Sequence, residues 1–218
     1  MMLRRTAAGV PGQAEFTLSY VSEMGVDLSL DWFVQWLETR IRNGEHFKVG
    51  ESLRVGWLTC FIAARPDGTL AIHEPDFQTI PMTLTEAVSR TLGQLWYQRQ
   101  VADSVGLVEK LDFPSCDQLA MMCTAFAGAD TVVLHRFTHE ADESGWFVGC
   151  NNAGHDHHDP AEIDYVSLYD LAVRNPAIVG FLALPADCTV IVGDEAPLIA
   201  RGDDVLSFRD GSLLASVF

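Results

Sequence analysis

Basic residues are scarce in this chain. Lys and Arg together number 14, against 30 Asp and Glu, which gives a formal net charge of -16. Nucleic acids and anionic membranes are bound through positive surfaces that replace released counterions. The composition therefore argues against nucleic-acid and membrane partners, and it suits either high solubility or a basic partner.

Long apolar runs and paired cysteines are also missing. No apolar run approaches the roughly 20 residues that cross a bilayer, and the residues after Arg4 and Arg5 lack the continuous apolar core of a secretory signal. We therefore expect a cytoplasmic protein. The five cysteines are odd in number, widely scattered and without a C-x-x-C pair, which favours reduced thiols over a disulfide framework or a zinc ribbon.

Local signatures of catalysis are absent as well. The chain has no G-x-S-x-G nucleophile turn, no G-x-G-x-x-G and no P-loop. Cys150 could pair with His155 or His139 as nucleophile and base, but five cysteines and seven histidines make some such pairing inevitable. The sequence predicts no catalytic residues and no cofactor.

Strand and helix patterns alternate without a regular βαβ rhythm, which predicts an α+β fold with mixed or antiparallel sheets and packed helices. We expect two compact halves, residues 1–110 and 111–218. The pattern of residues 115–127 is compatible with a helix and also with a buried strand, and the sequence does not decide between them. The expected strands are 15–21, 53–64, 70–75, 131–137, 146–150 and 188–192, and the expected helices are 31–42 capped by Asp31, 83–105 with a Thr83/Glu86 capping box, and 165–175 capped by Ser167.

The segment from Asp142 to Tyr169 concentrates unusual residues. No Lys or Arg occurs between Arg136 and Arg174, although this interval holds eight acidic residues. Aromatic anchors surrounded by carboxylates are typical of surfaces that recognise basic partners. The residues that we expect to bind a partner are Glu140, Asp142, Glu143, Trp146, Asp156, Asp159, Glu162, Asp164 and Tyr165.

The same segment offers an alternative, a zinc site in a metal-dependent hydrolase. Imidazole and carboxylate groups are zinc ligands, and the spacing of His155 and His157 places both side chains on one side of an extended segment. Asp159 would be the third ligand, with Cys150 nearby. The competing interpretation is that Asp159 caps a turn beginning at Pro160, while the histidines are solvated.

Three stretches of the C-terminal half carry a family resemblance. They are Asp142-Glu-Ser-Gly-Trp-Phe, Tyr165-Val-Ser-Leu-Tyr-Asp-Leu-Ala and Asn175-Pro-Ala-Ile-Val-Gly-Phe-Leu. Residues 131–204 resemble the immunity protein 33 family of bacterial polymorphic toxin systems. The resemblance implies an α+β fold and a non-enzymatic antidote that binds and blocks a co-produced protein toxin. It implies no catalytic residues and leaves the oligomeric state open.

Overall fold

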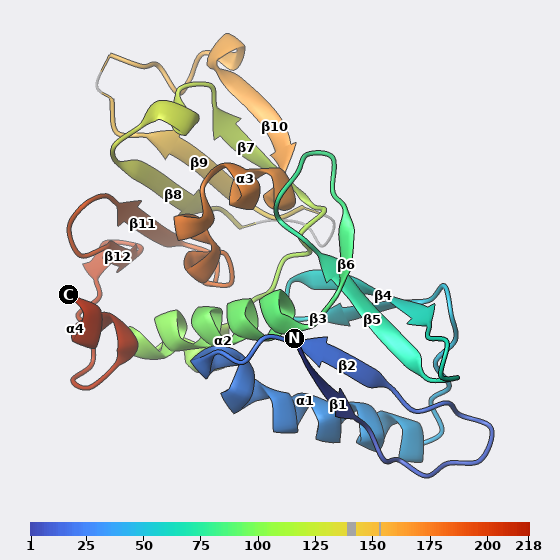
Figure 1. The fold of residues 1–218 in the computed structure, drawn as a ribbon. Coiled ribbons are helices and arrows are strands. Elements are labelled where there is room, and N and C mark those ends of the chain that lie inside the picture. The colour runs from blue at the N-terminus through green and yellow to red at the C-terminus, as the bar shows by residue number, and fades with distance from the viewer. Residues whose placement is uncertain (139–142, 153) are drawn as a thin grey trace. The chain divides into compact units, whose positions relative to one another are not determined.

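The computed structural model describes residues 1–138, 143–152 and 154–218. Helices combine with mixed and antiparallel sheets, so the predicted α+β class is confirmed (Figure 1). The chain forms two compact units, residues 1–97 and 98–218, that divide within helix α2 (Ser89–Ser104), whereas the sequence suggested a division after residue 110. No helix in the described part of the chain has both the length and the hydrophobicity needed to cross a membrane.

The strands of the first unit form a two-stranded ribbon and a four-stranded antiparallel sheet. The predicted turn near residues 65–69 is confirmed, because Ala64 pairs with Leu70 across it. The single strand predicted at 53–64 is instead two strands that pair with each other. The strands are β1 (Met2–Arg5) and β2 (Thr17–Tyr20) in the ribbon, and β3 (Ser52–Val55), β4 (Leu58–Ala64), β5 (Leu70–Pro75) and β6 (Leu84–Glu86) in the sheet.

Helix α1 (Met24–Arg42) begins earlier than the sequence predicted. Asp31 does not cap it, because this residue lies within the helix and forms an exposed ion pair with Arg4 at 3.1 Å. Phe33 and Leu37 lie on the buried face of the helix. The predicted end is confirmed, with Asn43 as the C-cap residue.

The long helix predicted from Thr83 is also corrected. Its first turn is strand β6, which pairs with β5, and helix α2 begins only at Ser89. The Thr83 hydroxyl bonds to Asp76, and the Glu86 carboxylate pairs with Arg65, so the two residues do not form a capping box. Strand pairing across the sheet has overridden a local helical pattern.

The second unit is built on a seven-stranded sheet with the order β10-β7-β9-β8-β11-β12-β13. Strands β7 and β9 run parallel, and the other neighbours are antiparallel. The stretch 115–127, which the sequence left open, contains strand β7. The strands are β7 (Leu119–Cys123), β8 (Val132–Arg136), β9 (Trp146–Cys150), β10 (Ile163–Ser167), β11 (Cys188–Val192), β12 (Leu198–Arg201) and β13 (Asp204–Val205).

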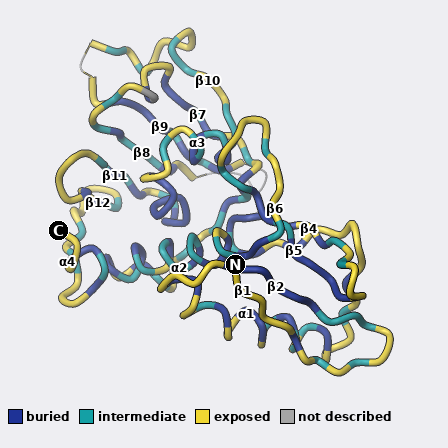
Figure 2. The backbone as a smooth tube through the Cα atoms, viewed as in Figure 1, coloured by how far each residue is buried: buried dark blue, intermediate teal, exposed yellow. Residues whose placement is uncertain are grey.

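Short helices complete this unit and cover its buried side. Ser167 caps α3 as predicted, because its hydroxyl accepts a hydrogen bond from the Asp170 N–H at 3.0 Å. Apolar residues of α3 and η4 are buried together with the central strands (Figure 2). The helical segments are η1 (Val108–Lys110), η2 (Phe126–Gly128), η3 (Pro160–Glu162), α3 (Leu168–Arg174), η4 (Pro176–Phe181) and α4 (Leu213–Val217).

Candidate functional site

The Ser-Gly-Trp turn before β9 is a structural feature. The Ser144 hydroxyl donates to the Leu119 carbonyl at 2.6 Å and accepts from the Trp146 N–H at 3.2 Å. Gly145 has a φ of 72°, which side-chain-bearing residues rarely adopt. Trp146 is only 1% exposed and donates from its indole nitrogen to the Leu182 carbonyl at 3.0 Å. Its ring therefore lies in the core, and we no longer assign it to a partner surface.

Arg136, the last basic residue before the acidic segment, is also buried. Its guanidinium donates to the carbonyl oxygens of Ser144, Asp112 and Leu184 and pairs with the Asp112 carboxylate at 3.0 Å. It lies over the Trp146 ring, 5.6 Å from the ring centroid. Burial lowers the pKa of Arg136. The Arg136 guanidinium therefore lies in the core and not on the surface beside the acidic loop.

The predicted partner-binding acids differ in their surroundings. Glu140 and Asp142 lie outside the described residues, and Glu143, Asp156, Asp159 and Asp164 are exposed. The predicted cap at Asp159 is confirmed, because its carboxylate accepts the Ala161 N–H at 2.9 Å. Asp156 similarly accepts the His158 N–H at 2.9 Å. These two acids shape the loop while their side chains remain accessible.

Strand β10 carries the predicted residues Asp164 and Tyr165 at one edge of the sheet, and Glu162 lies just before it in η3. Tyr165 is 67% exposed and pairs in register with Met121 of β7. Asp164, its neighbour, points to the opposite face because successive side chains of a strand alternate. A charged residue on an edge strand opposes unwanted pairing with other strands. This edge is therefore accessible and acidic.

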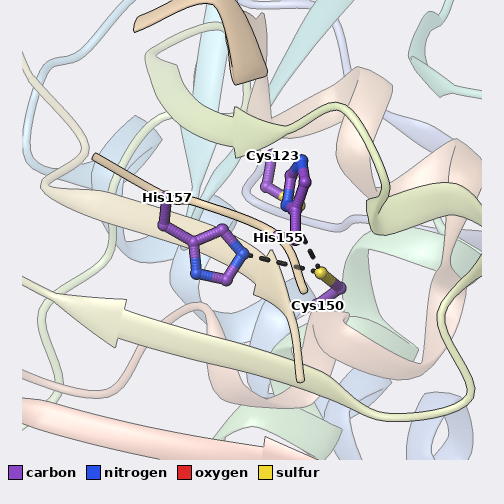
Figure 3. A group of neighbouring side chains, drawn as sticks. All are labelled: Cys123, Cys150, His155 and His157. Atoms are coloured by element: carbon purple, nitrogen blue, oxygen red, sulfur yellow. Dashed lines mark hydrogen bonds between the residues drawn. The ribbon is translucent and has the colours of Figure 1, made fainter. Parts of the chain in front are cut away.

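Four side chains converge where the parallel strands β7 and β9 end. Cys123 is the last residue of β7, and Cys150 is the last residue of β9. His155 and His157 come from the loop that follows β9 and turn back toward both sulfurs (Figure 3). One donor atom of each residue lies within 4.8 Å of the other three. We call these four residues the Cys/His cluster.

Sulfur and imidazole atoms contact one another directly within the Cys/His cluster. His155 Nδ1 lies 3.3 Å from Cys123 Sγ and 3.5 Å from Cys150 Sγ. His157 Nε2 lies 3.5 Å from Cys150 Sγ. Both cysteines are buried, and both histidines are partly buried. The ring nitrogens thus face the sulfurs in a small, shielded volume.

Groups outside the cluster also position the two histidine rings. The other nitrogen of His155, Nε2, lies 2.8 Å from Glu162 Oε2, which also accepts from the Thr124 hydroxyl at 2.7 Å. The His157 ring packs edge-on against Phe147, with centroids 5.4 Å apart. The hydrogen bond to Glu162 raises the pKa of His155, and the bonds from Thr124 and His155 lower the pKa of Glu162.

The two thiols have different proton affinities. Burial raises the pKa of the Cys123 thiol. Burial also acts to raise the pKa of Cys150, but hydrogen bonds from the Asn152 N–H and from His157 and Cys123 outweigh it and lower that pKa to about 7. Thiolates are the metal-binding and nucleophilic form of cysteine. The Cys/His cluster therefore contains one thiol that ionises readily near neutral pH.

The structure assembles part of the predicted zinc-ligand set and adds a residue that the sequence did not suggest. His155 and His157 lie together, and Cys150 joins them, whereas the Asp159 carboxylate caps η3. Cys123 is 27 residues before Cys150, and only the parallel pairing of β7 with β9 brings it near. The one local signal was its position at the end of an apolar run, which did not distinguish a strand from a helix.

Comparisons with known proteins bear on the same segment. No curated protein and no solved structure gave a match to this chain. A family model does match, and its span includes the Ser-Gly-Trp turn, the Cys/His cluster and strand β10. Residues 97–201 match the model of the Imm33-like domain.

Proposed function

We propose that this protein is an immunity protein that binds and neutralises a protein toxin. The observation that carries the proposal is the match of residues 97–201 to the model of the Imm33-like domain. The surface that we assign to the toxin consists of Asp156, Asp159, Glu162, Asp164 and Tyr165, and we call it the acidic face. Its residues come from the loop after β9, from η3 and from the edge strand β10.

Charge supports a basic partner for the acidic face. Within the described residues, Asp156, Asp159 and Asp164 form no ion pair with Lys or Arg. The interval between Arg136 and Arg174 contains no Lys or Arg that could approach them from the same segment. Unpaired carboxylates accelerate association with a positively charged protein, and the acceleration decreases as salt is added.

Tyr165 supplies an aromatic contact beside these charges. Its ring stands on the side of the sheet that also carries Met121 and Phe147, because the three residues are in register. Both of these neighbours are only partly buried. Tyrosine contributes large contact area with little loss of conformational entropy, and it is common among the residues that dominate binding energy. Tyr165 is therefore the residue that we expect to anchor the toxin.

The experiment is co-expression of the chain with each candidate toxin encoded beside its gene. We expect growth to be protected and the two proteins to co-purify. The double substitution Asp164→Lys and Tyr165→Ala should weaken binding at least about 30-fold, since single anchors of this kind contribute about 2 kcal/mol or more. The control is Asp203→Lys, which makes the same charge change in the turn before β13 at the other edge of the sheet.

Three results would count against the proposal. One is the absence of protection and of co-purification for every neighbouring gene product. Another is equal loss of binding in Asp203→Lys, which would indicate a general effect of net charge. The third is binding that does not change between low and high salt, because a carboxylate-steered interface must weaken as charges are screened.

The zinc hydrolase that the sequence offered as an alternative has less support. A catalytic zinc site uses three protein ligands and keeps a fourth position for water. The Cys/His cluster brings four side chains together, two of them cysteines, and the Asp159 carboxylate is engaged with the Ala161 N–H. Turnover of a substrate by the metal-loaded protein is the result that would revive this alternative.

A further inference from the structure

The Cys/His cluster contains more lone pairs on sulfur and nitrogen than its hydrogen bonds can satisfy. Each thiol has a single, weak S–H donor. Cys150 Sγ nevertheless faces imidazole nitrogens from both His155 and His157 and lies near Cys123 Sγ. Because the Nε2 of His155 bonds to the Glu162 carboxylate, that nitrogen carries the ring proton and the Nδ1 lone pair faces the two sulfurs. Four electron-pair donors thus point at one volume.

We propose that Cys123, Cys150, His155 and His157 bind one Zn²⁺ ion that fixes the loop after β9 to the ends of β7 and β9. Two thiolates and two imidazoles are a common ligand set of structural zinc sites. The observations behind this site do not involve toxin binding, although the loop that the ion would fix carries Asp156 and Asp159 of the acidic face.

The distances within the Cys/His cluster match the size of such a site. Zn–S bonds of about 2.3 Å and Zn–N bonds of about 2.0–2.1 Å place tetrahedral ligand atoms about 3.3–3.8 Å apart. The three sulfur–nitrogen distances are 3.3, 3.5 and 3.5 Å. All four donor atoms lie within 4.8 Å of one another, so only small rotations of side chains are needed to close the tetrahedron.

The surroundings also have the features of a metal site. Zinc-bound histidines usually donate their second N–H to a carboxylate, which orients the ring and increases its basicity. Glu162 has this place behind His155, and the Thr124 hydroxyl holds Glu162. A cavity of about 450 Å³ is lined by Cys150, Asp130, Thr131 and Asn152 among others, which gives an ion a route to Cys150.

Four protein ligands define the role of the ion. They leave no open position for a water molecule, so the zinc stabilises structure and performs no hydrolysis. Each thiol loses its proton on binding, and the two thiolates cancel the charge of Zn²⁺. The buried site is therefore neutral overall. The ion links Cys150 at the end of β9, and His155 and His157 of the following loop, to Cys123 at the end of β7.

The test uses the full chain, purified without a histidine tag, reduced and freed of metal with a chelator. Titration with Co²⁺ should give the visible absorption of a tetrahedral thiolate complex that saturates at one equivalent, and Zn²⁺ should displace it. Cys123→Ser and His157→Ala should weaken Co²⁺ binding more than about 100-fold, beyond the effect of losing an outer partner. The matched controls are Cys60→Ser, whose sulfur contacts Thr91 in the first unit, and His158→Ala in the same loop. Both should bind like the wild type.

Wild-type protein provides a readout that does not depend on how the variants fold. Removing zinc should increase amide hydrogen exchange in residues 151–162 and leave exchange in β4 and β5 unchanged. The proposal is overturned if the reduced wild type binds no metal at one equivalent, or if Cys123→Ser retains the full cobalt spectrum. It is also overturned if Cys123 and Cys150 form a disulfide and the reduced protein binds neither Co²⁺ nor Zn²⁺.

Discussion

Cys123 and Cys150 end two strands that lie side by side and run in the same direction. Parallel neighbours finish at the same edge of a sheet, so both thiols reach the loop that carries His155 and His157. In an antiparallel pair the two ends would lie at opposite edges. The donor set therefore depends on the direction of one strand pair.

Replacing Glu162 should weaken the metal site without removing a ligand. Glu162→Ala deletes the acceptor behind His155 Nε2, so the ring loses its orientation and part of its basicity. We expect Co²⁺ affinity to fall about 10–100-fold, as is typical for outer partners of metal ligands. Asp164→Ala removes an exposed carboxylate two residues later and is the control. Equal affinities for the two variants would contradict the assigned role of Glu162.

Gly149 should be intolerant of a side chain. A Cβ atom there would lie 2.8 Å from Phe147 Cε1 and 3.4 Å from His157 Cε1. Gly149→Ala must therefore displace the Phe147 ring, which packs against His157. We expect lower stability by about 1–3 kcal/mol, the usual cost of overpacking, and weaker cobalt binding. Gly128→Ala, which meets no atom within 4 Å, should change neither quantity in denaturant unfolding and metal titration.

Ser144 should matter for stability and not for recognition. Ser144→Ala leaves the Leu119 carbonyl and the Trp146 N–H without their buried partner. The free energy of unfolding should fall by about 1–3 kcal/mol, as measured by urea denaturation. Ser207→Ala, at an exposed position, should stay within about 0.5 kcal/mol of the wild type. A destabilised variant that still binds the toxin would separate the two roles.

Glu15 should make the first unit sensitive to acid. Burial acts to raise its pKa, but hydrogen bonds from the Thr6 hydroxyl and from the Gly9 and Ala8 N–H groups outweigh it, so the pKa lies below 4.5. A lowered pKa gives stability that is present above the unfolded-state pKa and is lost as pH falls through the folded-state value. Glu15→Gln should therefore be less stable than the wild type near pH 6 in a pH-dependent unfolding series, and the difference should shrink as the pH falls through the lowered pKa of Glu15.

The elements that the sequence predicted correctly carry short-range signals. Strand β9 follows a Ser-Gly turn, α3 begins at the Ser167 cap, and η3 begins after Asp159. In each case the deciding hydrogen bond joins residues a few positions apart. The hairpin of β4 and β5 belongs to the same group, because its turn contains Asp67 and Gly68.

The errors arose where distant residues decide the structure. The 84–105 stretch has helical spacing throughout, but pairing with β5 takes its first residues into β6. The sequence suggested that Trp146 is a surface anchor in an acidic segment. The alternation of side chains along β9 instead places it inward with Val148. Cys123 had no local mark of a ligand, because its partners lie 27 or more residues away along the chain.

The spacing of the four ligands also has a kinetic consequence. Cys150, His155 and His157 fall within eight residues and can gather as soon as this loop bends, whereas Cys123 arrives only when β7 docks beside β9. Contacts between residues far apart along a chain form slowly, because closing the intervening loop costs entropy. An ion would therefore bind to Cys150, His155 and His157 before it binds to Cys123. Completion of the tetrahedron would then mark the moment at which β7 has paired with β9.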